Sequence, residues 1–261
     1  MELASLDGAI APAAEARIPV TDDGLLRGDG AFEAVRLYAG RPFALEDHYA
    51  RLARSCAGLR LEPDFAALRA EVDALVAAAG PVDAILRIVV ARGGRRIALI
   101  EPVPSRPAMA RVGTIRYAPA RVLDGLKTLS YGANMLASRL AKEQGYDEAL
   151  LVTPHGRVLE GPTWSFFWVR DGELLTPPLE DRILASITRA RIIEESDAVE
   201  EPCTLEDLGA AQEAFMASTV REVLPIAAID DLELPAAPGP VTLQAREALA
   251  RRIGRELGAA V

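Results

Sequence analysis

Lysine is almost absent from this sequence of 261 residues: its 29 cationic side chains include only Lys127 and Lys142, so 29 − 2 = 27 are arginine. Cysteine is equally scarce. Cys56 and Cys203 lie far apart in the sequence, which indicates neither a disulfide framework nor the ligand spacing of a zinc site. No apolar run reaches the ~18 residues of a membrane-spanning helix, and the N-terminus lacks a signal-peptide pattern. We therefore expect a cytoplasmic protein that does not contact membranes.

Acidic residues outnumber basic ones, 38 to 29, so the formal net charge is −9. Non-specific nucleic-acid binding requires a basic face, so the charge argues against a nucleic-acid partner. Half of the residues are hydrophobic and about a quarter are charged, as in globular proteins. A site for a small anion remains possible, since local arginines can outweigh the overall charge.

The best candidate linker follows a predicted hairpin, "AILRIVVARGG" and "RRIALIEPV". There "EPVPSRPAMARVG" holds three prolines and little periodicity. It divides the chain into a small N-terminal α/β domain (1–106), a linker (107–112) and a large C-terminal domain (113–261) that carries Lys127. Strands and helices mix without strict alternation, which favours a two-domain α+β or mixed α/β fold.

The two lysines stand in different contexts. Lysine can lose its proton and form a Schiff base, whereas arginine stays charged. Lys142 lies mid-helix in "SRLAKEQG", which is typical of a solvated surface residue. Lys127 lies in "GLKTLSYG", between a predicted strand and a predicted helix. It is either a loop lysine or a reactive amine.

The sequence around Lys127 favours a reactive amine. Glu160 follows apolar residues in "GRVLEGPTW", where a carboxylate needs a partner such as a protonated ring nitrogen. "SITR" and "MASTVREV" place small hydroxyl residues at predicted strand-to-helix turns, where free N–H groups can bind a phosphate. An aldehyde-binding lysine, a pyridinium-binding carboxylate and phosphate donors are what pyridoxal 5′-phosphate requires.

The order of these motifs resembles the class IV aminotransferase family, the fold-type IV pyridoxal-phosphate enzymes. The resemblance runs through four segments: "DDGLLRGDGAFEAVRLYAGRPFALEDHYARLARS", "KTLSYGANMLASRLAKEQGYDEALLVTPHGRVLEGPTWSFFWVRDGELLTPP", "ILASITRARIIE" and "EAFMASTVREVLPI". It implies a two-domain homodimer with active sites near the interface. No single segment is decisive, but together they cover nearly the whole chain.

The resemblance assigns roles residue by residue. It makes Lys127 the Schiff-base lysine and proton carrier, and Glu160 the partner of the pyridine nitrogen. The remaining cofactor-binding residues would be Arg51 on the phosphate, Ile187 and Thr188 with Ser218 and Thr219 as phosphate donors, and Tyr131 near the ring face.

Each assignment has a simpler structural alternative. Arg51 could pair with a surface carboxylate, Glu160 could end a surface strand, and Thr188 and Thr219 could be caps. His48 and His155 are interpreted as a helix-packing residue and a turn residue, without a role in chemistry.

Three activities share this fold: L-branched-chain transamination, D-amino-acid transamination and aminodeoxychorismate lysis. Ile85, Ser165 and Ser218 depart from the branched-chain signatures. Phe32 replaces the tyrosine of the D-amino-acid enzymes, and Ser130 the asparagine common in the lyases. The turn "MASTVREVLPI" still resembles the D-amino-acid enzymes. We therefore favour a D-amino-acid transaminase with a ping-pong course, with the lyase and the branched-chain enzyme as alternatives. A cofactor-binding protein without catalysis would leave the retention of Lys127 unexplained.

The substrate carboxylate requires a cation, and arginine is the favoured donor. Arg36 and Arg87 alternate with apolar residues on predicted strands, so at least one can face inward. Arg92, Arg95 and Arg96 cluster at the hairpin turn, either as a carboxylate trap or as a solvated turn. Phe32 and these five arginines are the candidate substrate-binding residues.

The two lysines provide a direct test. We expect Lys127→Ala to abolish transamination and Lys142→Ala to leave it nearly intact, because only a primary amine can be exchanged for that of the substrate. Borohydride reduction followed by peptide mapping should label Lys127. A label on Lys142, or on neither lysine, would contradict the assignment.

Overall fold

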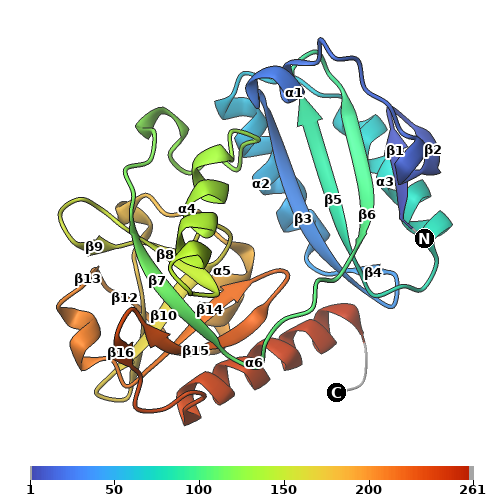
Figure 1. The fold of residues 1–261 in the computed structure, drawn as a ribbon. Helices are drawn as coiled ribbons and strands as arrows, with labels where there is room; N and C mark the ends of the chain where they lie inside the picture. Colours follow the sequence, from blue (N-terminus) through green and yellow to red (C-terminus); the bar gives the residue numbers. More distant parts are fainter. Residues whose placement is uncertain (1, 259–261) are drawn as a thin grey trace. The chain divides into compact units, whose positions relative to one another are not determined.

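The computed structural model describes residues 2–258, and the chain divides into two compact units (Figure 1). Unit 1 comprises Met1–Ser105 and Leu126–Tyr131, and unit 2 comprises Arg106–Gly125 and Gly132–Val261. This grouping differs from the expected boundaries, which placed Lys127 with residues 113–261. It also differs in the expected linker at 107–112, because strand β7 already begins at Ala110.

Unit 1 is a six-stranded sheet in the order β2-β1-β6-β5-β3-β4, and every strand pair is antiparallel. Two helices, α2 and α3, pack on one face of the sheet, as Figure 1 shows. The strands are β1 (Leu3–Leu6), β2 (Ala9–Pro12), β3 (Gly30–Tyr38), β4 (Arg41–Pro42), β5 (Ala84–Ala91) and β6 (Arg96–Pro102). The helices are η1 (Ala13–Glu15), α1 (Asp23–Arg27), α2 (Leu45–Gly58) and α3 (Phe65–Ala79). Strands β5 and β6 confirm the predicted hairpin.

Side-chain alternation divides β3 and β5 between the two faces of this sheet. Val35 and Leu37 of β3, with Leu86 and Ile88 of β5, are fully buried in the core beneath the helices. The intervening residues of both strands point to the face opposite the helices. That set includes Phe32, Arg36, Ile85 and Arg87.

One charged residue of β3 points into the core. Glu33 is fully buried, with Arg51 and His48 of α2 beside it. Its carboxylate accepts hydrogen bonds from Arg51 Nε at 2.7 Å and Nη2 at 2.6 Å, and lies 2.7 Å from His48 Nδ1. Burial alone would raise the pKa of Glu33, but the hydrogen bonds from Arg51 and His48 outweigh it and hold this pKa at about 2. Burial also lowers the pKa of His48.

The segment Leu126–Tyr131 joins unit 1 through backbone hydrogen bonds to the first residues of β3. Phe32 N donates to Lys127 O at 3.2 Å, and Leu129 N donates to Gly30 O at 2.8 Å. An antiparallel bridge links Ala31 and Thr128. The segment therefore runs along the edge of the sheet as a short extra strand, which is why Lys127 belongs to unit 1.

Unit 2 is built on a ten-stranded sheet of mixed direction. Its main path is β12-β11-β10-β14-β15-β7-β8-β9-β13, and β16 pairs with β15. The strands are β7 (Ala110–Arg116), β8 (Glu148–Val152), β9 (Arg157–Val158), β10 (Ser165–Arg170), β11 (Glu173–Thr176), β12 (Val199–Glu200), β13 (Cys203–Thr204), β14 (Glu213–Ser218), β15 (Glu222–Ile229) and β16 (Leu232–Glu233). Pairs β15–β7, β7–β8 and β11–β12 are parallel. The predicted tight turns at His155-Gly156 and Asp171-Gly172 are confirmed, with positive φ at Gly156, Asp171 and Gly172.

Three helices pack on this sheet: α4 (Gly132–Glu143) on β7 and β8, α5 (Ile187–Glu195) on β14, and α6 (Pro240–Leu257) on β14 and β15. Shorter 3₁₀ turns are η2 (Arg121–Leu123), η3 (Leu179–Asp181) and η4 (Asp207–Ala210). The core is aromatic, with Phe166 and Trp168 stacked at 5.7 Å between ring centroids. Within residues 2–258, no helix is both long and apolar enough to cross a membrane.

The buried cluster in unit 1 makes stability depend on pH. The contribution of Glu33 is present above its ordinary pKa of 4.5 and is lost as the pH falls toward 2, because its folded pKa is lowered. That of His48 is present above pH 6.5 and is lost below it, because the buried imidazole resists protonation. We expect urea denaturation between pH 3 and 8 to show the free energy of unfolding falling with acidity.

The part of this loss that Glu33 causes, on the order of 2 kcal/mol between neutral pH and pH 3, should be missing in Glu33→Gln. Glu46→Gln serves as the control, since Glu46 pairs with Arg69 at the exposed surface and its side chain is 75% exposed. Parallel stability curves for the parent and Glu33→Gln would contradict the expectation.

Candidate active site

The side chain of Lys127 lies against two aromatic rings of unit 1. Its Nζ is 4.4 Å from the centroid of Phe32 and 5.9 Å from that of Tyr131. The two rings meet edge to face at 5.3 Å. The Lys127 backbone is fixed independently, because its N–H donates to Ser55 Oγ at 3.0 Å. The backbone of Lys127 is thus held by hydrogen bonds, while its amine lies beside two aromatic rings.

Arg36 and Arg87 lie on the same face of the sheet as Phe32. The Arg87 guanidinium is 5.8 Å from the Phe32 centroid, and its Nε donates to Glu101 at 2.7 Å. Arg36 stacks on Tyr38 at 4.9 Å. We expected at least one of these arginines to face inward; both lie on the sheet face opposite the helices, and their role in binding substrate stays a prediction. Arg87 shares its aromatic neighbour with Lys127.

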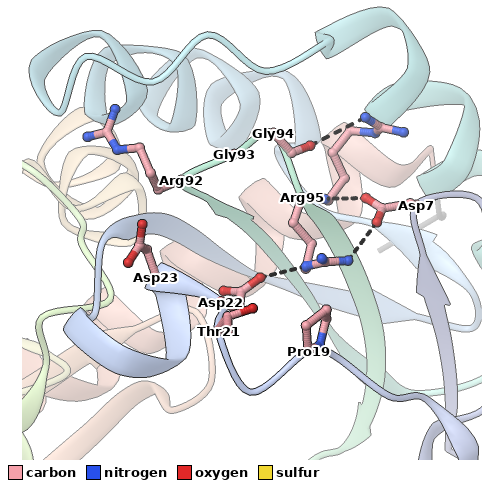
Figure 2. A pocket seen from close by; sticks show the side chains of 10 residues that line it. Asp7, Pro19, Thr21, Asp22, Asp23, Arg92, Gly93, Gly94 and Arg95 are labelled. Atoms are coloured by element: carbon pink, nitrogen blue, oxygen red, sulfur yellow. Dashed lines mark hydrogen bonds and ion pairs between the residues drawn. The ribbon is translucent and has the colours of Figure 1, made fainter.

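The hairpin arginines each have carboxylate partners of their own. Arg92 pairs with Asp29 at 2.9 Å, Arg96 pairs with Glu71 at 2.7 Å, and Arg95 bridges two aspartates. Figure 2 shows this bridge, in which Arg95 reaches Asp22 at 2.6 Å and Asp7 at 2.9 Å.

These arginines line a pocket of about 540 Å³ together with Thr21, Asp23, Gly93 and Gly94. The partner carboxylates balance the charge of the arginines, which argues against the binding of a substrate carboxylate at this turn. The carboxylate trap stays a prediction.

Glu160 of unit 2 follows β9 and is only half-buried. Its Oε1 accepts a hydrogen bond from Leu184 N at 2.9 Å. Tyr117 is close enough to sense the charge: burial raises its pKa, and the Glu160 carboxylate adds to that rise. The bond from Leu184 connects Glu160 to the segment that leads directly into α5.

Helix α5 begins at Ile187, after Ser186 as N-cap, and Ser186 Oγ accepts from Arg189 N at 3.3 Å. The predicted cap is therefore confirmed. Ile187 and Thr188 are both buried. Their N–H groups belong to the first turn of the helix, where the helix itself supplies no acceptor. Such a terminus favours an anion.

Ser218 and Thr219 lie at a strand-to-strand turn, so the expectation of a strand-to-helix turn was wrong there. Ser218 ends β14, and the chain returns antiparallel as β15 from Glu222, which has positive φ. Ser218 Oγ accepts from Arg221 N at 3.0 Å and stabilises the turn. The hydroxyls of such a turn can still donate to an anion.

The loop after Glu160 contacts the strand and the turn that carry Ser218 and Thr219. Ser165 of β10 pairs with Ala217, next to Ser218, and Thr163 Oγ1 accepts from Arg221 at 3.0 Å. The Glu160 carboxylate, the N-terminus of α5 and the turn at Ser218 and Thr219 are therefore connected within unit 2. The free N–H groups of such a helix start and the hydroxyls of such a turn are donors that fit a phosphate.

Sequence reasoning missed Glu33, His48 and Ser55. It interpreted His48 as a packing residue only, and it allowed Arg51 a surface partner. The structure shows instead a buried ion pair between Arg51 and Glu33. A usable signal was present, because Glu33 interrupts the apolar alternation of β3 and faces inward.

Comparison with known proteins identifies the family of this chain. Residues 30–229 match the model of the family described as amino-transferase class IV. A putative branched-chain-amino-acid aminotransferase of Methanocaldococcus jannaschii is 34% identical, over 86% of this chain and 87% of that protein. A bifunctional aminodeoxychorismate lyase / D-amino acid transaminase of Mycobacterium tuberculosis is 30% identical, over 90% and 93%.

A solved structure shows the same fold. The PLP-bound form of a hypothetical aminotransferase from Mycobacterium tuberculosis superposes with a TM-score of 0.88 at 26% identity, and the match covers 98% of this chain and 100% of that one. The predicted fold class is thereby confirmed. The chain belongs to the class IV aminotransferases, the family that the sequence motifs predicted and whose cofactor is pyridoxal 5′-phosphate.

Proposed function

We propose that this protein is a transaminase that moves an amino group between an amino acid and a 2-oxo acid by a ping-pong course. The observation that carries the proposal is the position of Lys127, whose amine lies over Phe32 beside Tyr131 and on the same sheet face as Arg87. Pyridoxal phosphate, when bound, withdraws electrons from the substrate Cα. The predicted homodimer and cytoplasmic location belong to the same proposal.

Different residues of this chain would handle the proton, the pyridine ring and the phosphate. Lys127 holds and moves the proton at Nζ, and the aromatic rings beside it limit exchange with water. Glu160 keeps the ring nitrogen protonated. Ile187 and Thr188 at the start of α5, with Ser218 and Thr219 at the turn, bind the phosphate. Arg51 contributes a further cation to that phosphate.

The substrate carboxylate is assigned to the strand arginines. Arg87 is the stronger candidate, because its guanidinium shares the Phe32 ring with the Lys127 amine. In its ion pair with Glu101, Arg87 donates from Nε, at one edge of the guanidinium. Arg36 lies two residues further along β3 from Ala34, the residue that pairs with Arg87.

The proposed donor is a D-amino acid. Ile85, Ser165 and Ser218 each depart from branched-chain signatures, and all three are buried in or beside the elements that carry the site. The branched-chain name of the Methanocaldococcus jannaschii relative supports the L-branched-chain enzyme as a second candidate. The bifunctional Mycobacterium tuberculosis relative supports a lyase that releases pyruvate and 4-aminobenzoate.

An absorbance titration of the holoenzyme tests the proposal directly. D-Alanine, D-glutamate, L-leucine and L-glutamate are added singly, and the spectrum of the cofactor is followed. We expect the D-amino acids to change it, because the transfer of their amino group alters the cofactor. A response to L-leucine alone would establish the branched-chain alternative. Pyruvate release from aminodeoxychorismate, without a response to any amino acid, would establish the lyase.

The arginines provide a second test. We expect Arg87→Met to raise the KM for D-alanine and D-glutamate alike, about ten- to hundred-fold, as for a lost charged hydrogen bond of roughly 1.5–3 kcal/mol. The α-carboxylate is common to both substrates, which explains the equal effect. Arg92→Met, Arg95→Met and Arg96→Met are the controls, and should leave KM nearly unchanged. A rise in the KM for D-glutamate but not for D-alanine in any of these three variants would instead support the carboxylate trap at the hairpin.

A further inference from the structure

Helix α2 directs three polar side chains into the core of unit 1. His48, Arg51 and Ser55 follow one another at spacings of three and four residues, so they share one face of the helix. Their exposed fractions are 0%, 5% and 1%. Polar groups are costly to bury unless they are hydrogen-bonded. All three have defined partners: Glu33 for His48 and Arg51, and Lys127 N for Ser55.

The carboxylate of Glu33 fixes both the position and the orientation of the Arg51 guanidinium. Oε1 accepts from Nε and Oε2 accepts from Nη2, so one edge of the planar group is held by two parallel bonds. A single bond would leave the plane free to rotate, whereas this pair fixes both its orientation and its depth in the core.

His48 in turn holds the carboxylate. Its Nδ1 lies 2.7 Å from Glu33 Oε2, the oxygen that also accepts from Arg51 Nη2. Because Glu33 stays ionised, Nδ1 carries the proton and donates. His48 therefore holds the Glu33 carboxylate, and the carboxylate holds the Arg51 guanidinium.

Stability alone gives a weak reason for this arrangement. A buried ion pair is often no more stabilising than apolar residues of the same volume, because removing both charges from water is costly. The cluster also lies beside the lysine segment, since Glu33 is the neighbour of Phe32 and Lys127 O accepts from Phe32 N. These facts connect the cluster to the site rather than to the core alone.

We propose that Glu33 and His48 are positioning residues for Arg51, which hold its guanidinium so that the other edge binds the cofactor phosphate. The inference rests on the phosphate role of Arg51 in the proposed function. It predicts that loss of the cluster geometry weakens recognition of the phosphate and leaves recognition of the pyridine ring and aldehyde unchanged.

The test compares two probes that differ only in the phosphate. The full-length apoprotein is titrated with pyridoxal phosphate and with pyridoxal, and the Kd of each is measured by absorbance. Glu33→Asp keeps the negative charge but shortens the side chain, so it alters geometry without removing the counter-ion of Arg51. We expect its Kd for pyridoxal phosphate to rise about ten-fold or more, with the Kd for pyridoxal unchanged.

Two histidine variants provide an independent measurement if Glu33→Asp does not fold. An asparagine amide can place a donor near the position of Nδ1, whereas a glutamine amide reaches toward Nε2. His48→Asn should therefore retain most of the preference for pyridoxal phosphate, and His48→Gln should lose it. Glu71→Asp is the matched control, because Glu71 makes a similar pair with Arg96 elsewhere in unit 1.

The outcomes separate the inference from the proposed function. If Arg51→Met lowers the preference for pyridoxal phosphate but Glu33→Asp and His48→Gln do not, the positioning role is wrong and the phosphate role stands. If Arg51→Met itself leaves the preference unchanged, the phosphate role of Arg51 is wrong and the inference is overturned with it. Equal weakening of both probes in Glu33→Asp would indicate a structural role only.

Discussion

The backbone pairing of Lys127–Leu129 with the first residues of β3 is the constraint on which the site in unit 1 depends. Two hydrogen bonds and one bridge attach a segment from the middle of the chain to a strand about a hundred residues earlier. These bonds fix the backbone from which the Lys127 side chain extends. The Ser55 hydroxyl adds a further attachment from α2.

Strand β3 places its side chains in two different environments, because successive residues point to opposite faces of the sheet. Phe32 points to the face that carries the Lys127 amine and Arg87, and Glu33, one residue later, points to the buried face that carries Arg51 and His48. A shift of one residue in the register of β3 would exchange these environments. The eight-residue pairing with β5 fixes that register.

Arginine carries almost all of the positive charge of this protein, and many of its arginines are engaged in ion pairs within one unit. At the hairpin turn, Arg92, Arg95 and Arg96 each bind carboxylates from elsewhere in unit 1 and connect the turn to Asp29, Asp22, Asp7 and Glu71. These pairs stabilise the start of β6. Unit 2 uses arginine in the same way, since Arg189 of α5 donates to Pro177 O at 2.8 Å and holds the helix against the end of β11.

The sequence by itself determined the family, the fold class and the identity of the main candidates. Local patterns sufficed for these: the rarity of lysine separated Lys127 from Lys142, Ser186 was recognisable as an N-cap, and glycine marked the turns. Only the tertiary structure decided which unit carries Lys127 and that the Ser218–Thr219 turn leads into a strand. It also decided that Arg51 is paired with Glu33 and His48. These outcomes depend on contacts between residues far apart in the chain, such as the pairing of β14 with β15 and of Lys127 with β3, and no local pattern encodes such a contact.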